Sequence, residues 1–287
     1  MRWSEPKAAP ESGRDHGLPV LTDPQRDTLL TRLGLSVHLA PSTDTAGLAT
    51  LVRAWLLAMP FHNLDLLAAS LGTRRSLDQD EALARCLSGL GGPCHVQSLG
   101  FAALLSACGF EVALCAATIG HPDDHLLVRV TLGREIWLCD VGNGQPYLTP
   151  FPLNTVQDIH HLGWHIRTEP CPGGLRLWRS SPDLPGGKLV YVASPAPRRW
   201  SDFANVITQH HAHPGFGPFM TGLRAVRLGT HRMDTLRDDR WTSFGPDGHT
   251  VRTVPMTELP RLLVDVFRLD GLPIETALIA WQHAQRT

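Results

Sequence analysis

Residues 89–109 read GLGGPCHVQSLGFAALLSACG, and this stretch decides the fold. The glycines at its start permit sharp backbone turns and the close approach of other groups. Apolar residues then recur at helical spacing until Gly109, a residue type that commonly ends helices. Cys94 is therefore predicted to open a buried helix directly after a glycine turn, and Pro93 suits the first helical position.

The chain before this turn is predicted to be mostly helical. Residues 1–22 are rich in proline, serine, glycine and charge, which is typical of a mobile tail. Capping residues and the spacing of apolar side chains then predict three helices, over residues 23–33, from 43–45 to 59, and over 77–87, the last announced by Ser76.

The chain after residue 109 is predicted to be mainly β-structure. Short runs rich in valine, leucine, isoleucine and tryptophan indicate an antiparallel sheet or barrel. These runs cover residues 110–119, 126–132, 135–141, 174–179 and 188–192. Two later strands, 223–228 and 250–254, are followed by predicted helices over 258–267 and 274–281.

Composition excludes several classes of protein. The 287 residues are 43% hydrophobic, enough for a sizeable core, and the net charge of -1 does not favour a nucleic acid or an anionic membrane as partner. No apolar run approaches the roughly 20 residues of a membrane span, and the polar first residues argue against a signal peptide. We therefore expect a cytoplasmic location, with reduced cysteines and, since no C-x-x-C pair occurs, no zinc site of that kind.

Cys94 differs from the other five cysteines, which read as small core residues. A helix N-terminus favours a thiolate, and a thiolate needs a base and an orienting carboxylate to act as a nucleophile. His125 and Asp140 flank a predicted hairpin around Gly133 and are expected to lie near the same end of it. From spacing alone, a loop histidine and a turn aspartate remain alternatives.

Six segments, in order and spacing, resemble motifs of the arylamine N-acetyltransferase family, and the resemblance extends over nearly the whole chain after the tail. They are residues 30–35 (LTRLGL), 59–65 (MPFHNLD), 91–94 (GGPC), 125–128 (HLLV), 138–144 (LCDVGNG) and 202–205 (DFAN).

The resemblance implies an α+β fold with a papain-like triad of Cys94, His125 and Asp140. It implies a helical first domain, an antiparallel β-barrel second domain and an α/β lid as the third region. The corresponding boundaries are 1–22 for the tail, then 23–108, 109–208 and 209–287.

The implied reaction is a ping-pong acyl transfer from an acyl-coenzyme A thioester, by way of an acyl group on Cys94, to a small-molecule amine. No metal and no covalently bound cofactor is expected. The residues expected to line the substrate pocket are Phe61, Gly142, Asn143, Gly144 and Phe219.

The chain departs from the family pattern close to the nucleophile. Leu90 replaces an arginine, His62 and Val96 replace glutamates, Ser98 replaces an asparagine, and Asn143 replaces an aromatic residue. These changes leave two alternatives open. One is an amide synthase that takes its acyl chain from an acyl carrier protein, and the other is a non-catalytic or hydrolytic relative.

Residues 209–215 resemble an insertion rich in histidine, where the family has a serine- and threonine-rich loop. Imidazoles can bind transition metals, so the cluster His210, His211 and His213 suggests a metal site. No carboxylate or cysteine stands nearby at a helpful spacing, so we favour a solvated or substrate-lining loop.

Overall fold

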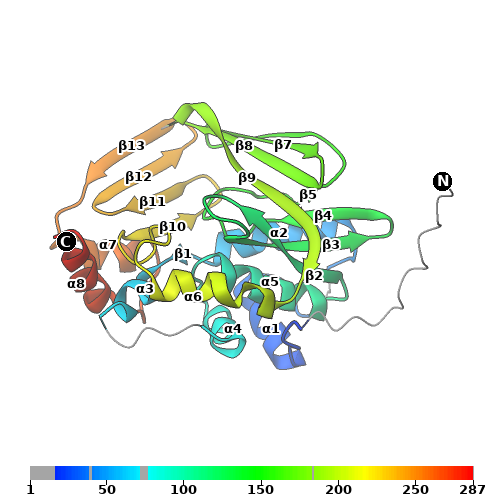
Figure 1. Ribbon diagram of the computed structural model, residues 1–287, viewed down its shortest axis with the longest axis horizontal. Coiled ribbons are helices and arrows are strands. Elements are labelled where there is room, and N and C mark those ends of the chain that lie inside the picture. The colour runs from blue at the N-terminus through cyan, green and yellow to red at the C-terminus, as the bar shows by residue number, and fades with distance from the viewer. Residues whose placement is uncertain (1–16, 39–40, 72–76, 183, 287) are drawn as a thin grey trace, which may run out of the picture.

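The computed structural model describes residues 17–38, 41–71, 77–182 and 184–286. Most of the predicted tail, residues 1–16, lies outside the described residues. Helices of the first third gather along one side of the molecule, below a large twisted sheet and beside a smaller one (Figure 1). Within the described part of the chain, every helix is too short or too polar to cross a membrane.

The first third contains five helices, which are α1 (Asp23–Arg32), α2 (Thr45–Ala58), α3 (Leu64–Ala69), α4 (Gln79–Leu87) and α5 (Cys94–Ala107). The predicted start of α1 is confirmed, because Thr22 and Gln25 form a capping box around its first turn. The predicted start of α4 is wrong. Asp78 caps this helix by accepting a hydrogen bond from the Glu81 N–H at 2.8 Å, and Ser76 lies outside the described residues.

Helix α5 is the centre of the largest core. Every residue from Cys94 to Leu105 is buried, including the polar side chains of His95, Gln97 and Ser98. Trp55 of α2 packs on Phe101 with ring centroids 5.3 Å apart. Gly100 lets α4 approach closely, because a Cβ there would lie 2.4 Å from the Cys86 sulfur. The nucleophile candidate therefore stands on a helix that is buried along most of its length.

Eight antiparallel strands form a nearly closed barrel in the order β5-β4-β3-β2-β9-β8-β7-β6 (Figure 1). They are β2 (Glu111–Thr118), β3 (His125–Leu132), β4 (Glu135–Cys139), β5 (Phe151–Pro152), β6 (Gln157–His161), β7 (Trp164–Cys171), β8 (Gly174–Ser181) and β9 (Leu184–Arg198). The antiparallel barrel predicted for this part of the chain is confirmed. Strands β5, β6 and β7 were not predicted.

A second antiparallel sheet has the order β1-β10-β11-β12-β13. Its strands are β1 (Phe61–His62), β10 (Arg224–Leu228), β11 (Met233–Arg237), β12 (Arg240–Gly245) and β13 (Gly248–Thr253). Helices α7 (Leu259–Asp265) and α8 (Ile274–Ala284) share a core with α3 and this sheet. Along the chain, a short 3₁₀ helix (Trp200–Phe203) and α6 (Ala204–Ala212) connect β9 to β10.

Residues 61–69 belong to the first third of the chain but pack with the last third. Asn63 fixes this exchange, because its side-chain amide donates to the carbonyls of Phe219 (2.7 Å) and Gly222 (2.6 Å) and accepts from the Arg224 N–H at 2.8 Å. The proposed domain boundaries stay a prediction, with this segment contributing to the third region.

Candidate active site

Cys94 is the first residue of α5 and is only 3% exposed. The chain reaches it through Gly91 and Gly92, whose φ angles of 68° and 143° suit glycine. Pro93 occupies the cap position and not the predicted first helical position. The sulfur thus lies at the helix end where free N–H groups and the helix dipole favour negative charge.

Gln97 holds the glycine turn in place, although the sequence analysis did not single it out. Its Nε2 donates to the carbonyls of Pro60 (2.7 Å) and Gly92 (3.3 Å), and its Oε1 accepts from the Trp55 indole at 2.7 Å. The sequence signal that could have identified Gln97 is a polar amide one turn after the nucleophile. Because all its polar atoms are satisfied inside the core, Gln97 fixes the backbone that carries Cys94.

His125 Nε2 lies 3.0 Å from both carboxylate oxygens of Asp140, and both side chains are buried. Antiparallel pairing of β3 with β4 places the start of one strand beside the end of the other. The Gly142 N–H also donates to Asp140 Oδ1 at 3.2 Å. This leaves Nδ1 of His125 for the Cys94 thiol, which is one of the groups that raise the pKa of the ring. The structure therefore brings together the three residues predicted as a triad.

The surroundings of His125 favour its charged form. Burial opposes protonation, but the charge of Asp140, its hydrogen bond and the neighbouring Cys94 outweigh it, so the pKa of His125 lies well above the usual value. An imidazolium beside Cys94 stabilises a thiolate. By contrast, burial raises the pKa values of Cys86 and Cys115 to about 12, which keeps both thiols protonated.

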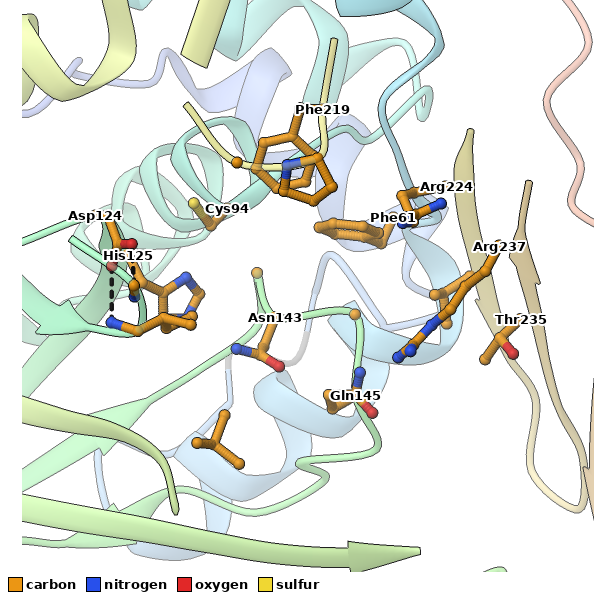
Figure 2. A pocket seen from close by; sticks show the side chains of 18 of the residues that line it. Phe61, Cys94, Asp124, His125, Asn143, Gln145, Phe219, Arg224, Thr235 and Arg237 are labelled. Atoms are coloured by element: carbon orange, nitrogen blue, oxygen red, sulfur yellow. Dashed lines mark hydrogen bonds between the residues drawn. The ribbon is translucent and has the colours of Figure 1, made fainter. Parts of the chain in front are cut away.

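A cavity of about 470 Å³ opens beside Cys94 and His125 (Figure 2). It is lined by all the predicted pocket residues, which are Phe61, Gly142, Asn143, Gly144 and Phe219. The rings of Phe61 and Phe219 face each other with centroids 6.2 Å apart. Gly142 packs directly on the nucleophile, because a Cβ there would lie 2.6 Å from the Cys94 Cα.

The prediction that residues 209–215 form a solvated or substrate-lining loop is largely wrong. His210 and His211 lie on α6 and are buried, and only His210 lines the cavity, while His213 is exposed. His211 Nε2 lies 2.9 Å from Nε2 of His95, the residue after the nucleophile. Burial and the neighbouring imidazoles lower the pKa of His95 well below its usual value, so His95 is neutral.

The wall beside the glycine turn carries no charge at His62, Leu90 and Val96, the three positions where the family pattern has charged residues. His62 and Val96 are fully buried and Leu90 is half-buried. Burial lowers the pKa of His62, so its imidazole is neutral. The nearest ion pair joins Arg85 of α4 to Asp65 of α3 at 2.6 Å.

Similar solved structures are arylamine N-acetyltransferases. The enzyme from Nocardia farcinica has a TM-score of 0.76 and 27% identity, over 89% of this chain and 92% of that chain. The enzyme from Mycobacterium abscessus has a TM-score of 0.78 and 22% identity, over 92% and 95%. The Mycobacterium marinum enzyme in complex with CoA has a TM-score of 0.76 and 21% identity, over 89% and 97%.

No curated protein is significantly similar in sequence to this chain. The model of a protein family described as N-acetyltransferase matches residues 44–273, which is most of the chain. Together with the shared fold, this match identifies an acyltransferase. The chain belongs to the arylamine N-acetyltransferase family.

Proposed function

We propose that this enzyme transfers an acyl group from a coenzyme A thioester to an amine, by way of a thioester on Cys94. The observation that carries the proposal is the position of Cys94, at a helix N-terminus and beside a buried His125–Asp140 pair that faces a cavity. The family match and the CoA bound to the Mycobacterium marinum relative support coenzyme A as the donor's carrier.

In the first half-reaction the Cys94 thiolate attacks the carbonyl carbon of the donor thioester. The bond from that carbon to the coenzyme A sulfur breaks, and the departing thiolate takes the proton held by His125. Asp140 keeps the imidazole in the required orientation and stabilises its charged form.

In the second half-reaction the amine nitrogen attacks the acyl carbon bound to Cys94. His125, now neutral, accepts a proton from the nitrogen, and the bond between the acyl carbon and the sulfur breaks. This releases the amide and restores the thiolate–imidazolium pair, so one proton and one acyl group are balanced over the cycle. Positioned acid–base help of this kind contributes about 10²–10⁴-fold in rate.

Intact-protein mass spectrometry after incubation with a panel of acyl-CoAs tests the proposal. The expected result is one added acyl group on the wild-type protein, none on Cys94→Ala, and loss of the adduct when an arylamine is added. Absence of any adduct on the wild-type protein across the panel would overturn the proposal and favour a binding relative.

We further propose that the acyl group is larger than acetyl. The cavity beside Cys94 supports this, because its volume of about 470 Å³ and apolar lining residues such as Phe61, Phe219 and Val226 suit a larger, more apolar acyl chain. The uncharged residues His62, Leu90 and Val96 are not among the described residues that line it. An amide synthase that works with a carrier-bound chain is one form of this proposal. Steady-state kinetics with acetyl-CoA and aniline test it. Transfer at the usual enzymatic kcat of roughly 1–10³ per second would refute it.

A further inference from the structure

Two neighbouring barrel strands place cations opposite each other on the cavity side. Along β8, Leu175, Leu177 and Arg179 share the inward face, and Arg179 is only 7% exposed. Lys188 of β9 is the direct cross-strand partner of Arg179. Both residues line the cavity. Like charges placed directly opposite each other destabilise a sheet. This pairing therefore lowers the stability of the fold and calls for a functional explanation.

Acidic side chains do not compensate these two charges within the described part of the chain. Among the cavity-lining residues only Asp124 is acidic, and its carboxylate accepts backbone N–H groups of the adjoining loop at 2.7 to 2.9 Å. Arg224, another lining residue, is already paired with Asp238 at 3.0 Å. Burial and the charges of Arg179 and Arg237 lower the pKa of Lys188, which shows how closely the cations are grouped.

Two buried hydrogen-bond donors in this part of the cavity wall also require an acceptor. The Nε atom of Arg179 and the Nε1 atom of Trp164, both from the cavity wall, have no hydrogen-bond partner among the residues that the structure describes. The Arg179 guanidinium lies over the Trp164 ring, 4.7 Å from its centroid. Neither nitrogen accepts hydrogen bonds, so only an acceptor group can satisfy them. An anion that accepts from the guanidinium would also offset its charge.

We infer that Arg179 and Lys188 form a subsite for an anionic oxygen group of a substrate, a carboxylate or a phosphate, on the barrel side of the cavity. This inference rests on the proposed function in one respect, since it takes the cavity as the substrate site. Figure 2 shows how far the cavity extends, with Arg237 and Thr235 across from Cys94 and His125. A substrate can therefore place its reactive atom at the sulfur and its anionic group elsewhere in the cavity.

Isothermal titration calorimetry tests the subsite with two matched pairs of probes that cannot turn over. Para-aminobenzoate is compared with the uncharged para-aminobenzamide, and 4'-phosphopantetheine with pantetheine, which differs from it only by the missing phosphate. The wild-type protein is expected to bind the charged member of one pair at least about tenfold more tightly, as charged hydrogen bonds typically do. The first pair reports a carboxylate on the amine, and the second a phosphate of the donor.

Arg179→Met and Lys188→Met are expected to abolish that preference and to leave binding of the uncharged probe unchanged. Arg176→Met is the matched control, because Arg176 lies on the other face of β8 and is exposed. It should keep the full preference. Equal binding within both pairs, or a preference that survives both substitutions, would overturn the inference.

A purely structural role for Arg179 is tested by urea unfolding. Removing an unpaired buried charge should leave the protein at least as stable as Arg176→Met. If Arg179→Met fails to fold, the exposed Lys188 carries the test. The binding measurements need no acyl transfer. Charge-dependent binding without an acyl-enzyme would therefore support the subsite and reject the proposed reaction. An acyl-enzyme without charge-dependent binding would support the reaction and reject the subsite.

Discussion

The imidazole of His62 donates a hydrogen bond from Nε2 to the carbonyl oxygen of Leu90 at 2.8 Å. Its other nitrogen, Nδ1, accepts from the Leu64 N–H at 3.3 Å, which fixes the tautomer. The first contact joins two positions at which the chain lacks the charged residues expected from the family pattern. A neutral, fully hydrogen-bonded imidazole has therefore taken the place of a charge in the wall beside the glycine turn.

Restoring only one of these charges should damage the protein. His62→Glu is expected to lower the free energy of unfolding by about 3–5 kcal/mol, because it leaves an uncompensated charge in a buried site. Adding Leu90→Arg should recover part of the loss. Urea unfolding at neutral pH measures both, with His62→Gln as a control that retains a donor for the Leu90 carbonyl. Equal stability of His62→Glu and the wild type would contradict the neutral wall.

Asp140→Asn should leave a folded but nearly inactive protein. The imidazole loses its preferred tautomer and the charge that stabilises its protonated form, so kcat/KM is expected to fall by about 10³–10⁴. The matched control is Asp158→Asn, which alters an exposed aspartate 2.7 Å from His165 in the barrel. Activity within about threefold of wild type in Asp140→Asn would remove the role given to this carboxylate.

Cys94 should be the only fast-reacting thiol. It lies at a helix N-terminus beside a charged imidazole, whereas burial raises the pKa of Cys139 well above its usual value and also raises that of Cys108. Near-stoichiometric iodoacetamide followed by peptide mapping checks this, with Cys94→Ser expected to lose the fast adduct. Modification of Cys108 or the half-buried Cys171 ahead of Cys94 would count against it.

Stability should be greatest near pH 6.5, the ordinary pKa of histidine. His125 has a raised pKa, so the native state binds more protons above that pH and its stabilisation is lost as pH rises. His62, His95 and His210 have lowered pKa values, mainly because of burial, so the unfolded state binds more protons below that pH and stability is lost as pH falls.

Urea unfolding from about pH 5 to about pH 9 should therefore give a maximum with two falling sides. Asp140→Asn should flatten the alkaline side only, because it removes the partner that raises the pKa of His125. A free energy of unfolding that rises steadily through pH 8 in the wild type would contradict the raised pKa given to His125.

Gly142→Ala should lower activity by displacing the nucleophile. The new Cβ would lie 2.6 Å from the Cys94 Cα and 3.0 Å from its carbonyl oxygen, and backbone cannot move aside cheaply. A displacement near 1 Å typically costs about 10² in rate. Gly120→Ala is the matched control, since it also lines the cavity and its Cβ would meet only Asp124 Oδ2 at 3.5 Å. Similar rates for the two variants would argue against this steric role.

The sequence predicts those parts of the fold whose signals are local. Thr22 predicts the start of α1, and short runs of apolar residues predict β2, β3 and β4. Strand β6, with the sequence QDIHH, has too few apolar residues to be recognised alone and forms only because β7 pairs with it. The segment 61–69 was missed because its partners lie at the other end of the chain.

The candidate site also has a part that local sequence signals predict and a part that they do not. Cys94, His125 and Asp140 stand in recognisable motifs, and the pairing of β3 with β4 brings His125 beside Asp140. Their spacing alone leaves a loop histidine and a turn aspartate as alternatives, and the resemblance to the family decides between them. The contact between His95 and His211 joins residues separated by 116 positions, so no local pattern contains it. Arg179 likewise resembles any strand cation until the register places it on the inward face.

The side-chain amide of Asn63 accepts its hydrogen bond from a residue 161 positions later in the chain, and this has a consequence for biosynthesis. At the usual pace of translation, the ribosome takes roughly ten to thirty seconds to make that intervening length. Until then β1 has no strand to join and α3 has no core to enter. The helical region of the nascent chain therefore cannot complete its packing before the last third of the chain has been made. Natural truncations and exchanges of segments between relatives should therefore be tolerated only when both ends of the chain change together.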